Sequence, residues 1–320
     1  MKRVLVIGAG GQIGSELVPF LRKKYGKENV IATGRRTPLP KVVTEGGPWM
    51  YLDALDQESL KKVIYENSIE HIYHMASILS ATGEKMPQTA WDINMNGLIN
   101  VLEVSRRYGV ERVIWPSSIA AFGPTTPRKN TPNETILQPT TMYGITKVSG
   151  ELMADYYYKK YGLLTLSMRL PGIISSETLP GGGTTDYAVE IFYEALANKK
   201  YTCFLKEDTA LPMMYQPDCL KCHIDMAEKD EKLFKRRVYN VTGMSFTAGE
   251  LAAEIKKHIP EFKIDYKPDF RQEIADSWPM SIDDSIAKKE WGWDPKYDLA
   301  AMVKDMLDVL GKRDLSAFKK

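Results

Sequence analysis

The stretch Val4-Leu-Val-Ile7-Gly8-Ala-Gly-Gly11-Gln-Ile-Gly14 sets the fold of the chain. Its apolar beginning predicts a buried strand, and the residues that follow have the apolar spacing of a helix. The glycines let the chain turn sharply at Gly8, let a phosphate approach the backbone at Gly11 and let the helix pack on the strand at Gly14. Because a helix N-terminus offers free N–H groups and a positive dipole, the stretch predicts a phosphate-binding turn.

The same alternation of short apolar strands and amphipathic helices continues through two-thirds of the chain. We expect strands at residues 3–7, 30–33, 71–75, 112–116 and 163–169, and helices at residues 12–25, 59–66, 89–108 and 142–161. This order indicates a Rossmann-type α/β fold, a doubly wound parallel sheet. After residue 170 come loops, a strand near 237–241 and helices at 248–258 and from 299. We predict a nucleotide-binding domain over residues 1–170, and a smaller, interwoven substrate lobe over residues 171–320.

The charged residues are balanced and scattered. The 320 residues include 43 Lys and Arg and 41 Asp and Glu, a net charge of +2, without a basic block. Nothing here favours nucleic acid or an anionic membrane as a partner. The first apolar run is too short for a signal peptide, and no run of 18 apolar residues occurs. We therefore expect a cytoplasmic protein.

One segment combines two cysteines with a histidine. Cys219-Leu-Lys-Cys222-His223 matches the C-x-x-C-H pattern of haem attachment. Haem attachment requires export, and zinc would need further ligands at matching spacing. We therefore expect these cysteines on a helix that begins near Asp218, and no metal site.

Tyr143-Gly-Ile-Thr-Lys147 opens the expected helix at 142–161. Side chains four residues apart share one face of a helix, so the phenol and the ammonium reach the same cleft. A tyrosine with a pKa of about 10 is a poor base at neutral pH. A neighbouring ammonium favours the phenolate and lowers that pKa. The pair therefore predicts a proton-transfer site.

The glycine spacing G-x-x-G-x-x-G, placed before this Y-x-x-x-K segment, resembles the extended short-chain dehydrogenase family. The resemblance implies that Tyr143 is the catalytic base, that Lys147 assists it and bonds the nicotinamide ribose, and that a serine hydroxyl binds the substrate oxygen. Counting back from Phe122-Gly123 selects Ser118 for that role, and Ser117 is then a structural hydroxyl.

The same resemblance implies which residues contact a nicotinamide dinucleotide. The segment from His74 to Ser77 resembles the cofactor-lining segment of the family, Asp53 its adenine-contacting aspartate and Asn94 its cofactor-side asparagine. The implied cofactor-binding residues are Gly8, Gly11, Gln12, Ile13, Gly14, Gly34, Arg35, Asp53, Met75, Ala76, Ser77, Asn94, Tyr143, Lys147 and Pro171.

Segments at residues 169–175, 179–188, 211–215 and 274–285 resemble one subfamily, the short-chain L-threonine 3-dehydrogenases. That resemblance runs to about residue 310. It implies oxidation of the β-hydroxyl of L-threonine to 2-amino-3-oxobutyrate, with NAD as cofactor, and a homodimer formed through helix packing. The implied substrate-binding residues are Ser80, Ser118, Tyr143, Gly183, Thr184, Thr185 and Trp278.

The glycine–threonine loop at 181–186 independently favours a small substrate with a carboxylate. Glycine N–H groups and threonine hydroxyls before the expected helix at 187–197 form an anion site without an arginine. The alternative is a plain capped helix with a flexible lead-in. Trp278 has an alternative too, as a core aromatic.

The second strand departs from the family pattern. It ends Thr33-Gly34-Arg35-Arg36, without the acidic residue that holds the ribose diol of NAD. Two guanidinium groups there suit the 2′-phosphate of NADP, although solvated or adenine-stacked arginines are an alternative. The resemblance implies NAD and the residues favour NADP, so both cofactors stay open.

Two rival functions remain. A nucleotide-sugar epimerase or reductase of the same extended family would need a larger lobe that grips a uridine diphosphate, and the compact loop at 181–186 argues against it. A regulatory protein that senses the cofactor would need the glycine turn without Tyr143, Lys147 and Ser118, so their joint presence favours an enzyme.

Overall fold

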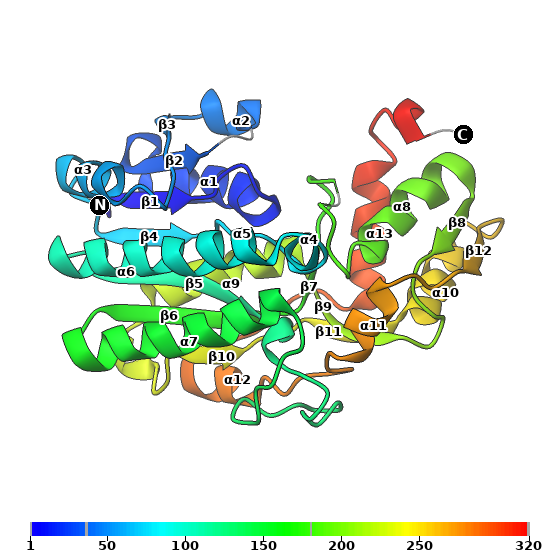
Figure 1. Ribbon diagram of the computed structural model, residues 1–320. Helices are drawn as coiled ribbons and strands as arrows, with labels where there is room; N and C mark the ends of the chain where they lie inside the picture. Colours follow the sequence, from blue (N-terminus) through cyan, green and yellow to red (C-terminus); the bar gives the residue numbers. More distant parts are fainter. Residues whose placement is uncertain (1, 36–37, 180, 319–320) are drawn as a thin grey trace.

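The computed structural model describes residues 2–35, 38–179 and 181–318. A seven-stranded parallel sheet forms its centre, in the order β10-β6-β5-β4-β1-β2-β3 (Figure 1). The strands are β1 Val4–Ile7, β2 Val30–Gly34, β3 Trp49–Tyr51, β4 His71–His74, β5 Arg112–Ser118, β6 Leu164–Leu170 and β10 Val238–Asn240. The order runs outward from β1 in both directions, which confirms the predicted doubly wound fold.

Helices cover both faces of this sheet because its strands are apolar on both sides. Leu5 and Ile7 of β1 face the helices α3 Gln57–Glu66, α6 Gly97–Arg107 and α7 Met142–Tyr161. Val4 and Val6 face the other layer, which contains α1 Gln12–Tyr25, α9 Gln216–Glu228 and α12 Ser285–Trp291. The predicted helices at 12–25 and 142–161 are confirmed.

The helix predicted at 89–108 is wrong as a single element. The structure has α5 Pro87–Trp91, a π-helical turn at Asp92–Asn96 and then α6. A π turn holds one more residue than an α turn, and such turns occur mostly at functional sites. Here the wider turn lies where the buried Asn94 bonds the loop after β4. Apolar periodicity does not reveal such a bond.

A smaller lobe lies beside the carboxyl ends of the sheet strands (Figure 1). It has two small sheets, β11-β9-β7 and β12-β8, packed with four helices around one apolar core. Its elements are β7 Gly172–Ile174, α8 Tyr187–Asn198, β8 Lys200–Cys203, β9 Ala210–Tyr215, β11 Met244–Thr247, α10 Ala248–His258, β12 Lys263–Tyr266, α11 Arg271–Asp276 and α13 Leu299–Leu310. The helix predicted at 248–258 is confirmed. The short helices α2 Lys41–Thr44 and α4 Ser80–Lys85 complete the chain, with short turns at Lys27–Asn29, Ile119–Ala121, Glu231–Leu233 and Ser316–Phe318.

The cysteine segment lies on α9, which begins at Gln216, two residues before the predicted start near Asp218. Cys219, Cys222 and His223 are all buried there, and Nδ1 of His223 lies 2.7 Å from the carbonyl oxygen of Cys219. Within the described ranges, no group of three or more His, Cys, Asp or Glu side chains is arranged to hold a metal. Nor does that part of the chain contain a helix with the length and apolar character needed to cross a membrane.

Candidate active site

The glycine turn after β1 has the shape of a phosphate cradle. Gly8 has a φ of +90°, and a Cβ there would lie 2.6 Å from the backbone nitrogen of Ala76. A Cβ at Gly14 would lie 2.3 Å from the carbonyl oxygen of Gly8. Gly11, the N-cap of α1, has no such steric conflict, and no side chain in the described structure caps α1. The backbone therefore leaves the helix N-terminus open to a phosphate.

A cavity of about 200 Å³ lies beside the cradle. Gly8, Arg35, Asp53, Ala76 and Ser77 line it, and all five were predicted to bind the cofactor. One nitrogen of the Arg35 guanidinium, Nη1, donates to Oδ2 of Asp53 over 3.4 Å, so an acidic partner does face this arginine. From the sequence we expect the adenosine end of a dinucleotide at these residues. Gly34 lies buried at the end of β2, and Arg36 lies outside the described residues.

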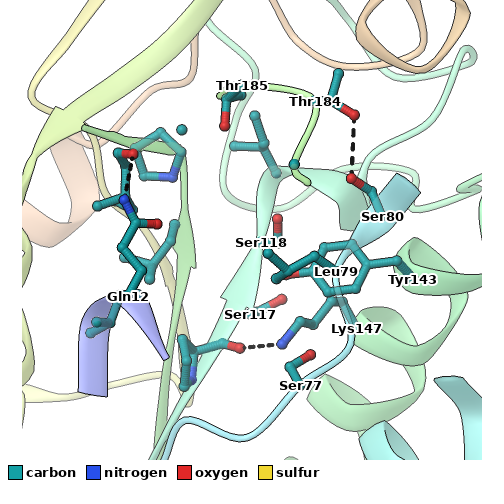
Figure 2. Close-up of a pocket in the computed structure, with 18 of the residues that line it drawn as sticks. Gln12, Ser77, Leu79, Ser80, Ser117, Ser118, Tyr143, Lys147, Thr184 and Thr185 are labelled. Atoms are coloured by element: carbon teal, nitrogen blue, oxygen red, sulfur yellow. Dashed lines mark hydrogen bonds between the residues drawn. The ribbon is translucent and has the colours of Figure 1, made fainter. Parts of the chain in front are cut away.

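A second cavity, of about 140 Å³, lies where the lobe meets the carboxyl ends of β5 and β6 (Figure 2). Ser77 lines both cavities, so they adjoin. The predicted cofactor residues that reach the second cavity are Gln12, Ile13, Met75, Ser77, Tyr143, Lys147 and Pro171. The predicted substrate residues that reach it are Ser80, Ser118, Tyr143, Gly183, Thr184, Thr185 and Trp278, the complete predicted set.

The first two turns of α7 bring the phenol and the ammonium together. Thr141 fixes the start of α7, because its hydroxyl accepts a hydrogen bond from the backbone N–H of Gly144. Lys147 donates from Nζ to the carbonyl oxygen of Pro116 over 2.8 Å, and this nitrogen lies 5.2 Å from the centre of the Tyr143 ring (Figure 2). Ser118, at the end of β5, faces the same space.

Burial controls the protonation of this pair. It raises the pKa of Tyr143 to about 12, and a hydrogen bond with Ser118 acts in the opposite direction. Burial also lowers the pKa of Lys147 to about 7, against the opposing effect of the Glu151 carboxylate. The sequence predicts that Lys147 lowers the pKa of Tyr143, whereas in this structure burial raises that pKa and Ser118, rather than Lys147, opposes the rise. Phenolate formation therefore needs additional positive charge in the cavity.

Asn94 lies behind the cofactor cavities and lines neither of them. Its Oδ1 accepts hydrogen bonds from the hydroxyl of Ser77 and the N–H of Ile78, and its Nδ2 donates to the Ile78 carbonyl and the Thr146 hydroxyl. Its amide group thus ties the loop after β4 to α7. Direct contact of Asn94 with a cofactor stays a prediction.

The substrate end of the cavity differs in one respect from the predicted anion site. The N–H groups of Gly182 and Gly183 donate to Oδ2 of Asp186 over 2.8 and 2.7 Å. The protein's own carboxylate thus already occupies these donors, so the idea that both are free for a substrate anion is wrong for this structure. The Thr184 hydroxyl lies 3.2 Å from the Ser80 hydroxyl (Figure 2).

Both interpretations of Trp278 hold in part. Its side chain is only 5% exposed and packs in the core of the lobe, yet it also lines the cavity. Sequence reasoning missed Asp186 as a site residue, although Asp186 is the last residue of the glycine–threonine loop at 181–186. It also missed the apolar or backbone lining at Leu79, Pro116, Ser117, Ile119, Leu170, Gly172 and Ile173.

A parallel sheet with a glycine cradle, joined to a cavity with Tyr143, Lys147 and Ser118, defines an oxidoreductase of the short-chain type that uses a nicotinamide dinucleotide. The chain belongs to the NAD dependent epimerase/dehydratase family, whose profile matches residues 4–242.

Relatives and solved structures are similar over almost the whole chain. The mitochondrial L-threonine 3-dehydrogenase of Bos taurus is 48% identical, over 97% of this chain and 83% of its own. The L-threonine dehydrogenase structure from Clostridium difficile is 49% identical with a TM-score of 0.95, covering 98% of both chains. The holo form of a GalE-like L-threonine dehydrogenase from Cupriavidus necator is 50% identical with a TM-score of 0.93, covering 96% of this chain and 99% of that one.

Proposed function

We propose that this chain is an L-threonine 3-dehydrogenase, which oxidises the β-hydroxyl of L-threonine to give 2-amino-3-oxobutyrate. The observation that carries the proposal is one cavity in which Tyr143, Lys147 and Ser118 face Ser80 and the threonine loop. Threonine dehydrogenases at about half identity over nearly the full chain support it.

The residues present fit a nicotinamide dinucleotide. A Cβ at Gly8 or Gly14 would clash with neighbouring backbone atoms, so these glycines are needed for the tight turn before α1, and the two adjoining cavities extend from Arg35 and Asp53 to Lys147. When bound, the dinucleotide supplies the hydride acceptor and, in its oxidised form, a positively charged ring. Such a charge favours the phenolate form of a buried tyrosine.

In this proposal Tyr143 accepts the proton of the substrate hydroxyl. Ser118 donates a hydrogen bond to the same oxygen and fixes its position between the two groups. Lys147, held at the carbonyl of Pro116, supports the phenolate from one helical turn away. When the proton leaves, the electron pair of the O–H bond forms the new carbonyl. The hydrogen on the β-carbon leaves with the C–H electron pair as a hydride, for which the dinucleotide would be the acceptor.

The charged ends of threonine find different partners in this cavity. Lys147 and Asp186 are the two charged side chains among its described lining residues. We assign the substrate ammonium to the Asp186 carboxylate, because a buried cation requires a paired anion. The hydroxyls of Ser80, Thr184 and Thr185 then remain as donors for the substrate carboxylate.

Arg35 bears on whether the cofactor is NAD or NADP. We propose that NADP is used at least comparably with NAD, because β2 ends without an acidic residue and Arg35 faces the adenosine cavity. The ion pair of Arg35 with Asp53 is partly exposed, so a 2′-phosphate can compete for the guanidinium.

We also propose a homodimer, formed through the outer face of α7. Four apolar or aromatic side chains on this helix are exposed: Ile145 by 40%, Leu152 by 68%, Tyr156 by 49% and Tyr161 by 44%. Exposed apolar side chains along one helix are typical of association sites. The cytoplasmic location, the absence of a nucleic-acid partner and the domain boundary near residue 170 stay predictions.

The deciding experiment follows absorbance at 340 nm with threonine and each nicotinamide cofactor. The panel also contains allo-threonine, serine, 3-hydroxybutyrate and a UDP-sugar. Preferred turnover of threonine is the expected result. Serine, which lacks one methyl group, should react about 10–200-fold less well. Turnover of the UDP-sugar alone would favour the epimerase rival, and equal rates on 3-hydroxybutyrate would remove the amino-acid substrate.

A further inference from the structure

Glu151 is a buried carboxylate that no step described so far uses. It lies on α7 one turn after Lys147 and two turns after Tyr143, and its side chain is 5% exposed. One oxygen, Oε1, accepts from the Ser117 hydroxyl over 2.5 Å and from Nε of Arg169 over 2.9 Å. The other, Oε2, accepts from Nη2 of Arg169 over 2.8 Å. The carboxylate therefore bridges α7, β5 and β6.

These bonds form a seam between α7 and β5. Three consecutive residues of β5 meet three consecutive turns of α7: Ser118 meets Tyr143, the carbonyl of Pro116 accepts from Lys147, and the hydroxyl of Ser117 donates to Glu151. The reactive groups occupy two of these three contacts. The third contact joins the same helix and strand without a reactive group.

The far side of the seam is fixed to the sheet. The guanidinium of Arg169 donates to the carbonyl of Asn133 over 2.6 Å and to Oδ1 of Asn240 over 3.2 Å. Ser117 itself is held on its other side, because its N–H donates to the Ser167 hydroxyl over 3.1 Å. Every described polar contact of Glu151 thus leads to a residue with further bonds.

Stability alone does not explain such an arrangement. Burying two charges costs desolvation free energy that a well-packed apolar pair would avoid. A fully bonded polar network does, however, fix one arrangement of its members. Proton and hydride transfer are sensitive to this, since a displacement of 1 Å can lower a rate by about 100-fold.

We propose that Glu151 is a positioning residue for the oxidation: with Ser117 and Arg169 it fixes the seam that sets Tyr143, Lys147 and Ser118 relative to one another. The inference rests on the proposed function in one respect, because it requires that an alcohol is oxidised at Tyr143. The negative charge of Glu151 also helps to keep Lys147 protonated, because it opposes the lowering of the Lys147 pKa by burial.

Two variants and one control test this proposal. Ser117→Ala removes one hydroxyl and leaves every charge in place, and Glu151→Gln removes the charge at constant size. The control is Glu103→Gln, which makes the same change in a glutamate that pairs with Arg106 and Arg107 and lines neither cavity. Steady-state kinetics give kcat and KM for alcohol and cofactor, and thermal unfolding is followed in parallel.

Both seam variants should lose about 10–100-fold in kcat, with both KM values within about threefold of wild type. The control should keep its kcat. Ser117→Ala keeps the test valid if Glu151→Gln does not fold. Near-normal kcat in Ser117→Ala, or an equal loss in the control, would overturn the inference.

The kinetics use whichever alcohol of the substrate panel the wild-type chain oxidises. If that alcohol is not threonine, the proposed substrate is wrong, and a kcat loss in the seam variants still supports the positioning role. If the wild type oxidises no alcohol with either cofactor, the proposed function and this inference are both overturned.

Discussion

At the scale of single residues, Tyr143 has the most direct consequence. Tyr143→Phe keeps the ring and its packing but removes the group that accepts the substrate proton. Turnover should fall by about 10²–10⁴-fold, while the dissociation constant of the cofactor changes little. Stopped-flow or steady-state rates and cofactor fluorescence measure the two effects. Near-normal turnover would exclude Tyr143 as the base.

Lys147 provides a prediction about stability and pH. Its pKa in the folded chain, about 7, lies below the ordinary value of 10.5 because of burial. Between these values the unfolded chain binds more protons, so stability rises with pH, and the full cost of burial is present below about pH 7.

Lys147→Met removes that cost. The variant should therefore unfold at a higher temperature than wild type at pH 6, with a difference that shrinks towards pH 10, and it should be inactive. Thermal unfolding at pH 6, 8 and 10 measures this. A variant less stable than wild type at pH 6 would show that the bond to Pro116 outweighs the desolvation.

Asp186 provides a prediction about specificity. Asp186→Asn keeps the shape of the side chain and removes the charge that we assign to the substrate ammonium. A charge-assisted hydrogen bond is worth about 1.5–3 kcal/mol, so the KM for threonine should rise by about 10–100-fold. The KM for 3-hydroxybutyrate, which has no ammonium, should change far less.

The matched control for Asp186 is Glu190→Gln, one turn further along α8, where the carboxylate accepts from Tyr201 and does not line the cavity. It should leave both KM values unchanged. An equal loss on both substrates in Asp186→Asn would assign the residue to folding of the Gly182–Gly183 turn instead.

Residues differ in how far sequence predicts them. Gly8 and Gly14 were predictable, because their role is set by the local turn between β1 and α1. Tyr143 and Lys147 were predictable from helical spacing. Glu151 was not, since only the tertiary fold brings its partners Ser117 and Arg169 near. Asp186 bonds its own loop, and only the fold shows that it also lines the cavity.

At the scale of elements, the proposed preference between NAD and NADP depends on the turn after β2. Gly34→Asp places a carboxylate where the ribose of the cofactor meets the end of β2. This should repel a 2′-phosphate and bind a ribose diol, so preference should move towards NAD. The ratio of kcat/KM for the two cofactors is the measurement. Equal or better use of NADP by this variant would show that another segment reads the adenosine end.

The helix before β5 shows where element prediction fails. Apolar spacing over 89–108 fits one long helix, and most of those residues are indeed helical. The π turn at Asp92–Asn96 depends on the bonds of Asn94 to the loop after β4. A contact between distant segments thus changes a local structure, which a periodic pattern cannot encode.

At the scale of the whole molecule, the proposed dimer depends on the outer face of α7. Leu152→Glu puts a charge on its most exposed apolar residue and should convert the dimer to a monomer. Leu233→Glu, at another exposed leucine, is the control that should remain dimeric. Size-exclusion chromatography with light scattering gives the masses. A monomeric wild type would contradict the proposal.

The position of β10 has a consequence for biosynthesis. This strand completes the central sheet by pairing Val238 with Ser167. In the sequence, however, much of the lobe lies between these two residues. While the ribosome synthesises that intervening segment, the outer edge of β6 remains unpaired. Unpaired strand edges promote aggregation. The nascent chain therefore exposes this edge between the release of residue 170 and the release of residue 240, an interval in which a chaperone would protect it.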